Sequence, residues 1–234
     1  MEIKDIQPSR ILDADQLDEV IHFDSGNYHN SIFFTKYRYL TTDFKGKPIV
    51  ENEKYIRTKS LWYADLFNGR TEEIVPYGPF DIEENHIAQN YVYFIKILDK
   101  DGDGLLAEDY TTGAEIWRVN KRQKTIEFCF DCKEKYTHFN FETANDDVVV
   151  FRNEDEVTEL YFVDLLNHRI ARLLIDHDGD NEFDFRFVED EERNPTYFLT
   201  KKWIFEAEPS SPTHTLNCIM WTELLTQLDW TPYF

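Results

Sequence analysis

The segment Asn90-Tyr91-Val92-Tyr93-Phe94-Ile95-Lys96 carries the pattern that decides the fold. It begins with a turn residue, continues with β-branched and aromatic residues, and ends with a polar residue. This order is typical of a turn that leads into a short buried strand. The same pattern recurs in residues Asn30–Lys36, Asp146–Arg152 and Asn194–Thr200. The sequence therefore predicts four equivalent strands, which begin at Asn30, Asn90, Asp146 and Asn194.

A second pattern follows each of these strands along the chain and ends in an acidic or amide residue. Its copies are Leu61–Asp65, Ile116–Asn120, Leu160–Asp164 and Ile219–Glu223. Turn residues and a further apolar segment follow the first three copies. Groups of strands that recur about every 50 residues are typical of a radial array of sheets such as a β-propeller.

We therefore predict an all-β protein, a β-propeller with four blades of four antiparallel strands. It would form a single domain over residues 1–234, with blades at about residues 20–75, 76–130, 131–174 and 175–230. Four residues hold equivalent places in the second pattern and are expected to pack between the sheets. They are Trp62, Trp117, Tyr161 and Met220.

The second pattern resembles the blades of TolB-type and WD-like propellers, in which a strand like Leu160–Asp164 precedes the last hairpin of the blade. This resemblance covers residues 20–230 and implies a fold without implying an activity. TolB-type propellers usually have more blades. Two arrangements therefore stay open: a closed ring of four blades, or a ring completed by a second subunit.

Composition limits the classes of function. The chain has 234 residues with 46 acidic and 25 basic ones, which give a net charge of −21. Such a field repels nucleic acid and suits cations or a basic protein partner. Hydrophobic residues make up 41% and aromatic residues 16% of the chain, which is enough for a packed core rather than disorder.

The sequence contains no apolar run of the ~18 residues that a membrane span needs. The N-terminus lacks the basic and apolar regions of a signal peptide. We therefore expect a soluble, cytoplasmic protein that binds no membrane, while a secreted or periplasmic mature form stays open.

Three cysteines, Cys129, Cys132 and Cys218, are too few for a disulfide framework. Cys129 and Cys132 form a C-x-x-C pair, but no second pair completes a zinc site. The pair does not stand at the start of a helix after a strand, as a thioredoxin-like motif does. A redox or metal role is therefore the less favoured interpretation of this pair, and the role of the three cysteines stays open.

Two acidic loops are the candidate sites for metal. Carboxylates stand at every second position, at Asp99, Asp101 and Asp103 in the first loop and at Asp176, Asp178, Asp180 and Asp184 in the second. Glycine or asparagine next to them permits the tight turn that aims several carboxylates at one centre. Oxygen ligands at this density select a hard cation, above all Ca²⁺. The alternative is a pair of solvated acidic turns.

The first loop resembles the D-x-D-x-D-G core of EF-hand and dockerin calcium loops, but Tyr110 stands where an acidic twelfth residue belongs. The second loop resembles the calcium loops of integrin-type propeller blades, with Asn181 where glycine is common. These resemblances imply Ca²⁺ as the ligand of one or both loops. Blade topology places both loops, and the long loops at residues 37–59 and 206–215, on one face, which we expect to be the working surface.

Other constellations are weaker. His22 and His138 stand at equivalent places eight residues before Asn30 and Asp146, where the other two units have Ile82 and Arg186. These side chains would converge on the axial channel of a propeller, either around an anion or metal or around water alone. Ser210, Ser211 and His214 lack the context of a hydrolase nucleophile.

The sequence thus favours a non-enzymatic, calcium-stabilised β-propeller that binds a protein partner through its loop-rich face. One alternative is an acidic inhibitor or immunity-type protein that masks a basic partner. Another is a propeller enzyme that acts on carbohydrate with a calcium-supported site, although no catalytic pair can be named.

Overall fold

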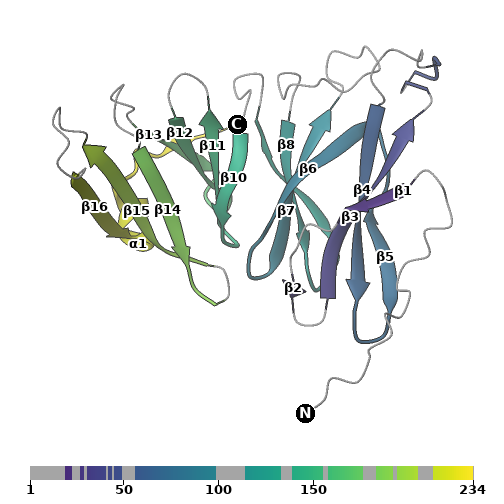
Figure 1. The fold of residues 1–234 in the computed structure, drawn as a ribbon, viewed down its shortest axis with the longest axis horizontal. Helices are drawn as coiled ribbons and strands as arrows, with labels where there is room; N and C mark the ends of the chain where they lie inside the picture. The colour runs from purple at the N-terminus through teal and green to yellow at the C-terminus, as the bar shows by residue number, and fades with distance from the viewer. Residues whose placement is uncertain are drawn as a thin grey trace. The chain divides into compact units, whose positions relative to one another are not determined.

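The computed structural model describes residues 19–22, 27–28, 31–40, 42–43, 45–48, 56–98, 114–132, 139–154, 158–175, 183–191, 194–204 and 213–233. Most of these residues lie in β-strands, which confirms the prediction of an all-β protein. Figure 1 shows that the strands of a sheet follow one another in the chain, as the gradual change of colour within each group of arrows indicates; the exception is β17 (Thr231–Pro232), which joins the third sheet from the C-terminal end. Among the described residues, no helix combines the length and the apolar composition needed to cross a membrane.

The chain divides into two compact units. The first contains Met1–Glu83 and Lys96–Ala107, and the second contains Glu84–Ile95 and Glu108–Phe234. The prediction of a single propeller domain stays a prediction, and the sheets are described one by one.

The first sheet has the order β1-β3-β4-β5, with β2 paired to β3. Its strands are β1 (Glu19–His22), β2 (Asn27–Tyr28), β3 (Ser31–Leu40), β4 (Ile56–Asp65) and β5 (Arg70–Val75). Its strands pair in antiparallel fashion, and β3 pairs with β4 from Ser31 opposite Asp65 to Leu40 opposite Ile56. The first predicted strand therefore begins one residue after Asn30.

The second sheet has four strands in the order β6-β7-β8-β9. They are β6 (Phe80–Ile87), β7 (Tyr91–Leu98), β8 (Ala114–Asn120) and β9 (Ile126–Asp131). Strand β7 contains Tyr91–Lys96, the apolar part of the pattern that begins at Asn90. Four successive residues of it, Val92, Tyr93, Phe94 and Ile95, are buried, so this strand has apolar cover on both faces.

The third sheet has the order β10-β11-β12-β13-β17. Its strands are β10 (Phe139–Ala144), β11 (Val148–Glu154), β12 (Thr158–Asp164), β13 (Arg169–Ile175) and β17 (Thr231–Pro232). The short β17 adds a fifth strand from the C-terminal end of the chain to the outer edge of β13. The sequence patterns did not predict this strand.

The fourth sheet has three strands in the order β14-β15-β16, where four were predicted. They are β14 (Phe183–Glu189), β15 (Pro195–Ile204) and β16 (Thr213–Met220). The predicted strand Ile219–Glu223 is wrong beyond Met220, because helix α1 (Trp221–Gln227) begins there. Trp221 and Leu224 stand three residues apart, so the helix places both on one side, where they are buried.

The helix changes which aromatic residue enters the core. Met220 is 52% exposed, so its predicted place between the sheets is wrong, while Trp221 is only 5% exposed. The ring of Trp221 lies 6.0 Å from both Phe162 and Phe187, in a cluster with Val150 and Phe198. Of the other three predicted positions, Tyr161 is buried, whereas Trp62 and Trp117 are half-buried.

Candidate protein-interaction site

The predicted metal ligands lie almost entirely outside the described residues. This holds for Asp99, Asp101 and Asp103 of the first loop and for Asp176, Asp178 and Asp180 of the second. Asp184 belongs to β14, where its backbone pairs with Lys201. In the part of the chain that the structure describes, no group of three or more His, Cys, Asp or Glu side chains is arranged to hold a metal ion. Calcium binding by the loops stays a prediction.

The structure describes the side chains of only two of the four residues that were assigned to an axial channel. Ile82 is buried, and Arg186 is exposed on β14. His22 lies in β1, where only its backbone is described, and His138 lies outside the described residues. Their convergence stays a prediction.

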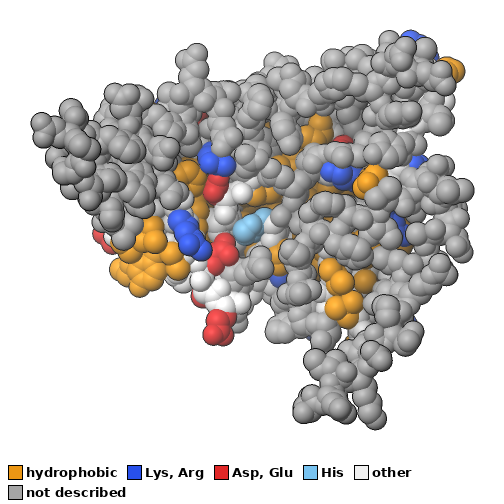
Figure 2. Space-filling model, viewed as in Figure 1, with side chains coloured by type: hydrophobic (Ala, Val, Ile, Leu, Met, Phe, Trp, Pro, Cys, Tyr) orange, Lys and Arg blue, Asp and Glu red, His pale blue; other side chains and the backbone are white. Residues whose placement is uncertain are grey.

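A different polar cluster joins the inner strands β6, β10 and β14, and it consists of His86, Thr143 and Glu189. Thr143 Oγ1 donates to Glu189 Oε1 at 2.8 Å, and the Ala144 N–H donates to His86 Nε2 at 3.1 Å. The register shifts beside Thr143 in β10 and beside Glu189 in β14. Such irregularities re-aim side chains, which is how two neighbouring sheets bring these groups together. Figure 2 shows a histidine among acidic, basic and uncharged polar side chains.

This cluster has the residue types of a catalytic relay but not its connections. Covalent catalysis by a hydroxyl requires a hydrogen bond from the nucleophile to its base. The buried Thr143 hydroxyl instead donates to Glu189, and His86 Nε2 lies 3.8 Å from the same Glu189 oxygen while it accepts from the Ala144 N–H. These contacts hold β6, β10 and β14 together, and we assign the cluster that structural role.

The two cysteines of the C-x-x-C pair are buried. Burial, with a smaller contribution from nearby Glu127, raises the pKa of Cys129 to about 12 even though Arg118 opposes the shift. At neutral pH this thiol is protonated, and a protonated thiol is a poor nucleophile and a poor metal ligand.

Equivalent residues of the second and third repeats contact each other and join the two sheets. The Asn90 N–H donates to Asp146 Oδ1 at 2.9 Å, and both residues are predicted strand starts. Arg118 Nη1 donates to the Asp146 carbonyl at 2.7 Å, while its guanidinium lies 3.9 Å from the Tyr91 ring centroid and pairs with Glu127. The sheets containing β7 and β11 are thus fixed to each other by side chains on both.

In three of the sheets, the turn after the third strand has the same hydrogen-bonded backbone, which we call the frame of the turn. In each, the side-chain oxygen of the last strand residue accepts backbone N–H groups of the turn. Asp65 accepts from Phe67 at 2.9 Å, Asn120 from Gln123 at 2.9 Å, and Asp164 from Asn167 at 3.0 Å. Aspartate and asparagine suit this place because their short side chains reach the backbone two or three residues on.

The fifth residue of each turn has a positive φ: 71° at Gly69, 60° at Lys124 and 51° at His168. This conformation suits glycine and costs other residues about 1–2 kcal/mol. The turn shape is therefore kept in three places, even where the residue present adopts it at a cost.

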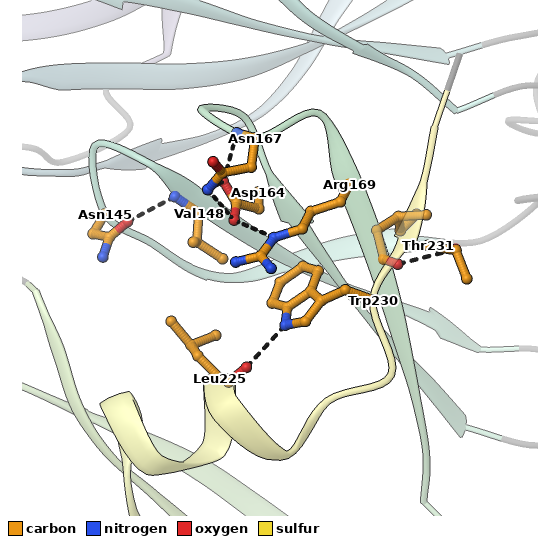
Figure 3. A network of polar contacts seen from close by, with 9 residues as sticks. Asn145, Val148, Asp164, Asn167, Arg169, Leu225, Trp230 and Thr231 are labelled. Carbon is orange, nitrogen blue, oxygen red and sulfur yellow. Dashed lines mark hydrogen bonds and ion pairs between the residues drawn. The ribbon is translucent and has the colours of Figure 1, made fainter.

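The Asp164 turn is tied to the C-terminal segment of the chain. Figure 3 shows Asp164 between Asn167 and Arg169, with the Trp230 ring against Arg169. Arg169 Nε donates to Asp164 Oδ2 at 2.7 Å, and its guanidinium lies 4.5 Å from the Trp230 ring centroid. Burial by itself raises the pKa of Asp164, but hydrogen bonds from Asn167 and Arg169 outweigh it and hold the pKa below its usual value.

Replacing Asp164 with alanine is expected to lower the free energy of unfolding by about 1–3 kcal/mol, because the N–H donors of Asn167 and Arg169 lose a charged acceptor. The depressed pKa of Asp164 means that its carboxylate stabilises the fold above the unfolded pKa of about 3.9, and that this contribution is lost as the pH falls through the folded pKa. Urea unfolding from pH 7 down to pH 3 measures both effects.

Asp164→Asn is the control, because it keeps a hydrogen-bond acceptor and loses the ion pair. The difference in free energy of unfolding between this variant and the natural protein should therefore shrink in acid. A difference that does not change with pH would contradict this assignment.

The three turns share their hydrogen bonds but differ in the residue at the tip, which is the second residue after the Asp or Asn that begins the turn. The tip residues are Phe67, Arg122 and Leu166, and all three side chains are exposed. Phe67 is 89% exposed and Leu166 is 70% exposed. Sequence reasoning located the turns but gave no reason to single out these tips, because an apolar residue within a turn resembles one from an adjoining strand.

Comparison with known proteins adds little beyond the fold. No family model matches the sequence, and no curated protein matches it. Among solved structures, the chain is similar to the β-propeller domain of the Trilobed protease from Pyrococcus furiosus, which is described as having an open velcro topology. The identity is 8% and the TM-score is 0.47, over 87% of this chain and 55% of that one. The strands themselves show that this chain is an all-β protein, and a β-propeller domain is among the solved structures to which it is similar.

Proposed function

We propose that this protein is a non-enzymatic β-propeller of four blades that binds a protein partner. The observation that carries the proposal is the repeated turn with a constant frame and a variable tip. A rigid scaffold that presents different exposed side chains from equivalent places suits recognition, whereas the folding of the turn does not require these tips. Phe67, Arg122 and Leu166 are the tips in question.

The chain leaves β3 and β15 at the opposite ends of their sheets from the turn after β4 and from helix α1 after β16, because successive strands are antiparallel. We propose that the long loops after β3 and β15 each offer a further contact to the partner and that the two acidic loops bind Ca²⁺. The net charge of −21 supports the narrower alternative of an inhibitor that masks a basic partner.

The proposal is tested by capture from cells that make the protein, with the full chain as bait in 150 mM salt. The control bait carries Phe67→Ser, Arg122→Ser and Leu166→Ser. These side chains are exposed, so the control is expected to keep its fold. We expect a protein that is retained by the natural chain, is depleted on the control and binds directly when purified. Equal retention of every protein by both baits would contradict the proposal.

A further inference from the structure

The β4–β5 hairpin ends in a projecting apolar tip. Among the described residues, Phe67 is the large apolar side chain with the highest exposure, and Leu66 beside it is 40% exposed. The first four residues of β5, Arg70 to Glu73, are exposed one after another. Because successive side chains of a strand point to opposite faces, this end of β5 is exposed to solvent on both of its faces.

The tip is held rigidly. Asp65 Oδ2 accepts from Asn68 Nδ2 at 2.7 Å, and Asn68 Oδ1 accepts from the Arg70 N–H at 2.9 Å. Gly69 takes the positive φ of 71°, and its N–H donates to the Asp65 carbonyl at 2.8 Å. A side chain on such a fixed turn loses little conformational entropy when it binds, which favours an aromatic anchor.

The fold itself does not need an aromatic residue at this place. The equivalent turns have Arg122 and Leu166 there with the same frame. Phenylalanine at 89% exposure buries almost nothing within its own chain. Large aromatic side chains are instead characteristic of the few residues that dominate binding between proteins.

The charge beside the tip indicates the kind of partner. Glu72 and Glu73 are exposed on β5 next to the tip, against the single basic Arg70. The whole chain carries a charge of −21, which opposes docking of a second copy of the same chain. Lysine and arginine on a partner would complement these carboxylates and speed association.

We propose that Leu66 and Phe67 are the anchor for a protein partner whose surface has an apolar pocket bordered by lysine or arginine. This inference rests on the proposed protein-binding function and names the surface and the chemistry of the partner. Phe67 enters the pocket, and Glu72 and Glu73, which point to opposite faces of β5, meet lysine or arginine on either side of it.

The experiment places the photo-crosslinking residue p-benzoylphenylalanine at position 67 of the full chain, and at position 128 of a second variant as the matched control, because Phe128 is an exposed phenylalanine of β9 that belongs to none of the turn tips. The adduct that forms from position 67 is identified, and the partner is purified. Its dissociation constant is then measured by calorimetry for the natural chain, Phe67→Ser, Phe128→Ser and the double variant Glu72→Gln/Glu73→Gln. Circular dichroism melting confirms that each variant is folded.

We expect an adduct at position 67 that is absent or weaker at position 128. Phe67→Ser should weaken binding roughly 30-fold, as a hot-spot residue does, while Phe128→Ser changes it less than about twofold. The glutamate double variant should weaken binding and reduce its dependence on salt. Equal adducts at both positions, or an unchanged affinity for Phe67→Ser, would overturn the inference and leave the protein-binding function standing. A failure of every variant and of the natural chain to bind any protein would overturn both.

Discussion

Replacing Trp221 with alanine is expected to lower the free energy of unfolding by about 3–5 kcal/mol. The Trp221 side chain is 5% exposed and begins the helix that stands where a fourth strand was predicted. Its ring contacts Phe162 of the third sheet and Phe187 of the fourth. Its removal would therefore leave a cavity between two sheets, and urea unfolding followed by circular dichroism measures the loss.

The matched control is the residue immediately before it. Met220→Ala is expected to change the free energy of unfolding by less than about 0.5 kcal/mol, because Met220 is 52% exposed. If the two substitutions cost the same, or if Met220→Ala costs more, the strand would continue past Met220 as the sequence pattern predicted, and the helix assignment would fail.

Calcium is expected to stabilise the protein by about 2.7 kcal/mol when free Ca²⁺ is one hundred times its dissociation constant. If Asp176, Asp178, Asp180 and Asp184 converge as predicted, their mutual repulsion destabilises the empty loop and a bound cation removes it. Mg²⁺ should stabilise less, because it resists dehydration and prefers a tighter octahedron. Thermal unfolding with Ca²⁺, Mg²⁺ or a chelator measures the difference.

The controls for calcium separate the two loops. Asp178→Asn with Asp180→Asn should abolish the calcium-dependent shift if the second loop is the main site. Asp101→Asn with Asp103→Asn tests the first loop in the same way. A melting temperature that responds to neither Ca²⁺ nor chelator would show that both loops are solvated acidic turns.

The strands were predictable because their periodic patterns report burial directly. Strand β7 begins one residue after the predicted start at Asn90, and β11 begins two residues after Asp146. The end of the fourth sheet was not predictable, because Ile219-Met220-Trp221 fits an alternating strand as well as the start of a helix. The spacing of Trp221, Leu224 and Leu228 at three and seven residues carried the helical signal that the strand pattern obscured.

The candidate site was predictable only in part. Asp65, Asn120 and Asp164 were recognised as turn residues, and their hydrogen bonds follow from the chemistry of short carboxylate and amide side chains. The exposure of Phe67 depends on how far its hairpin projects beyond the sheet, which no local pattern encodes. The cluster of Thr143 and Glu189 depends on irregular registers in two strands, and these also leave no periodic mark.

The most direct test of the protein-binding scaffold is one dissociation constant, measured by calorimetry between the captured partner and the chain with and without its three turn tips. The account predicts that the natural chain binds and that the variant Phe67→Ser/Arg122→Ser/Leu166→Ser binds at least about 30-fold more weakly while remaining folded. An affinity that is the same for both proteins would contradict the account and exclude these turns as the contact surface.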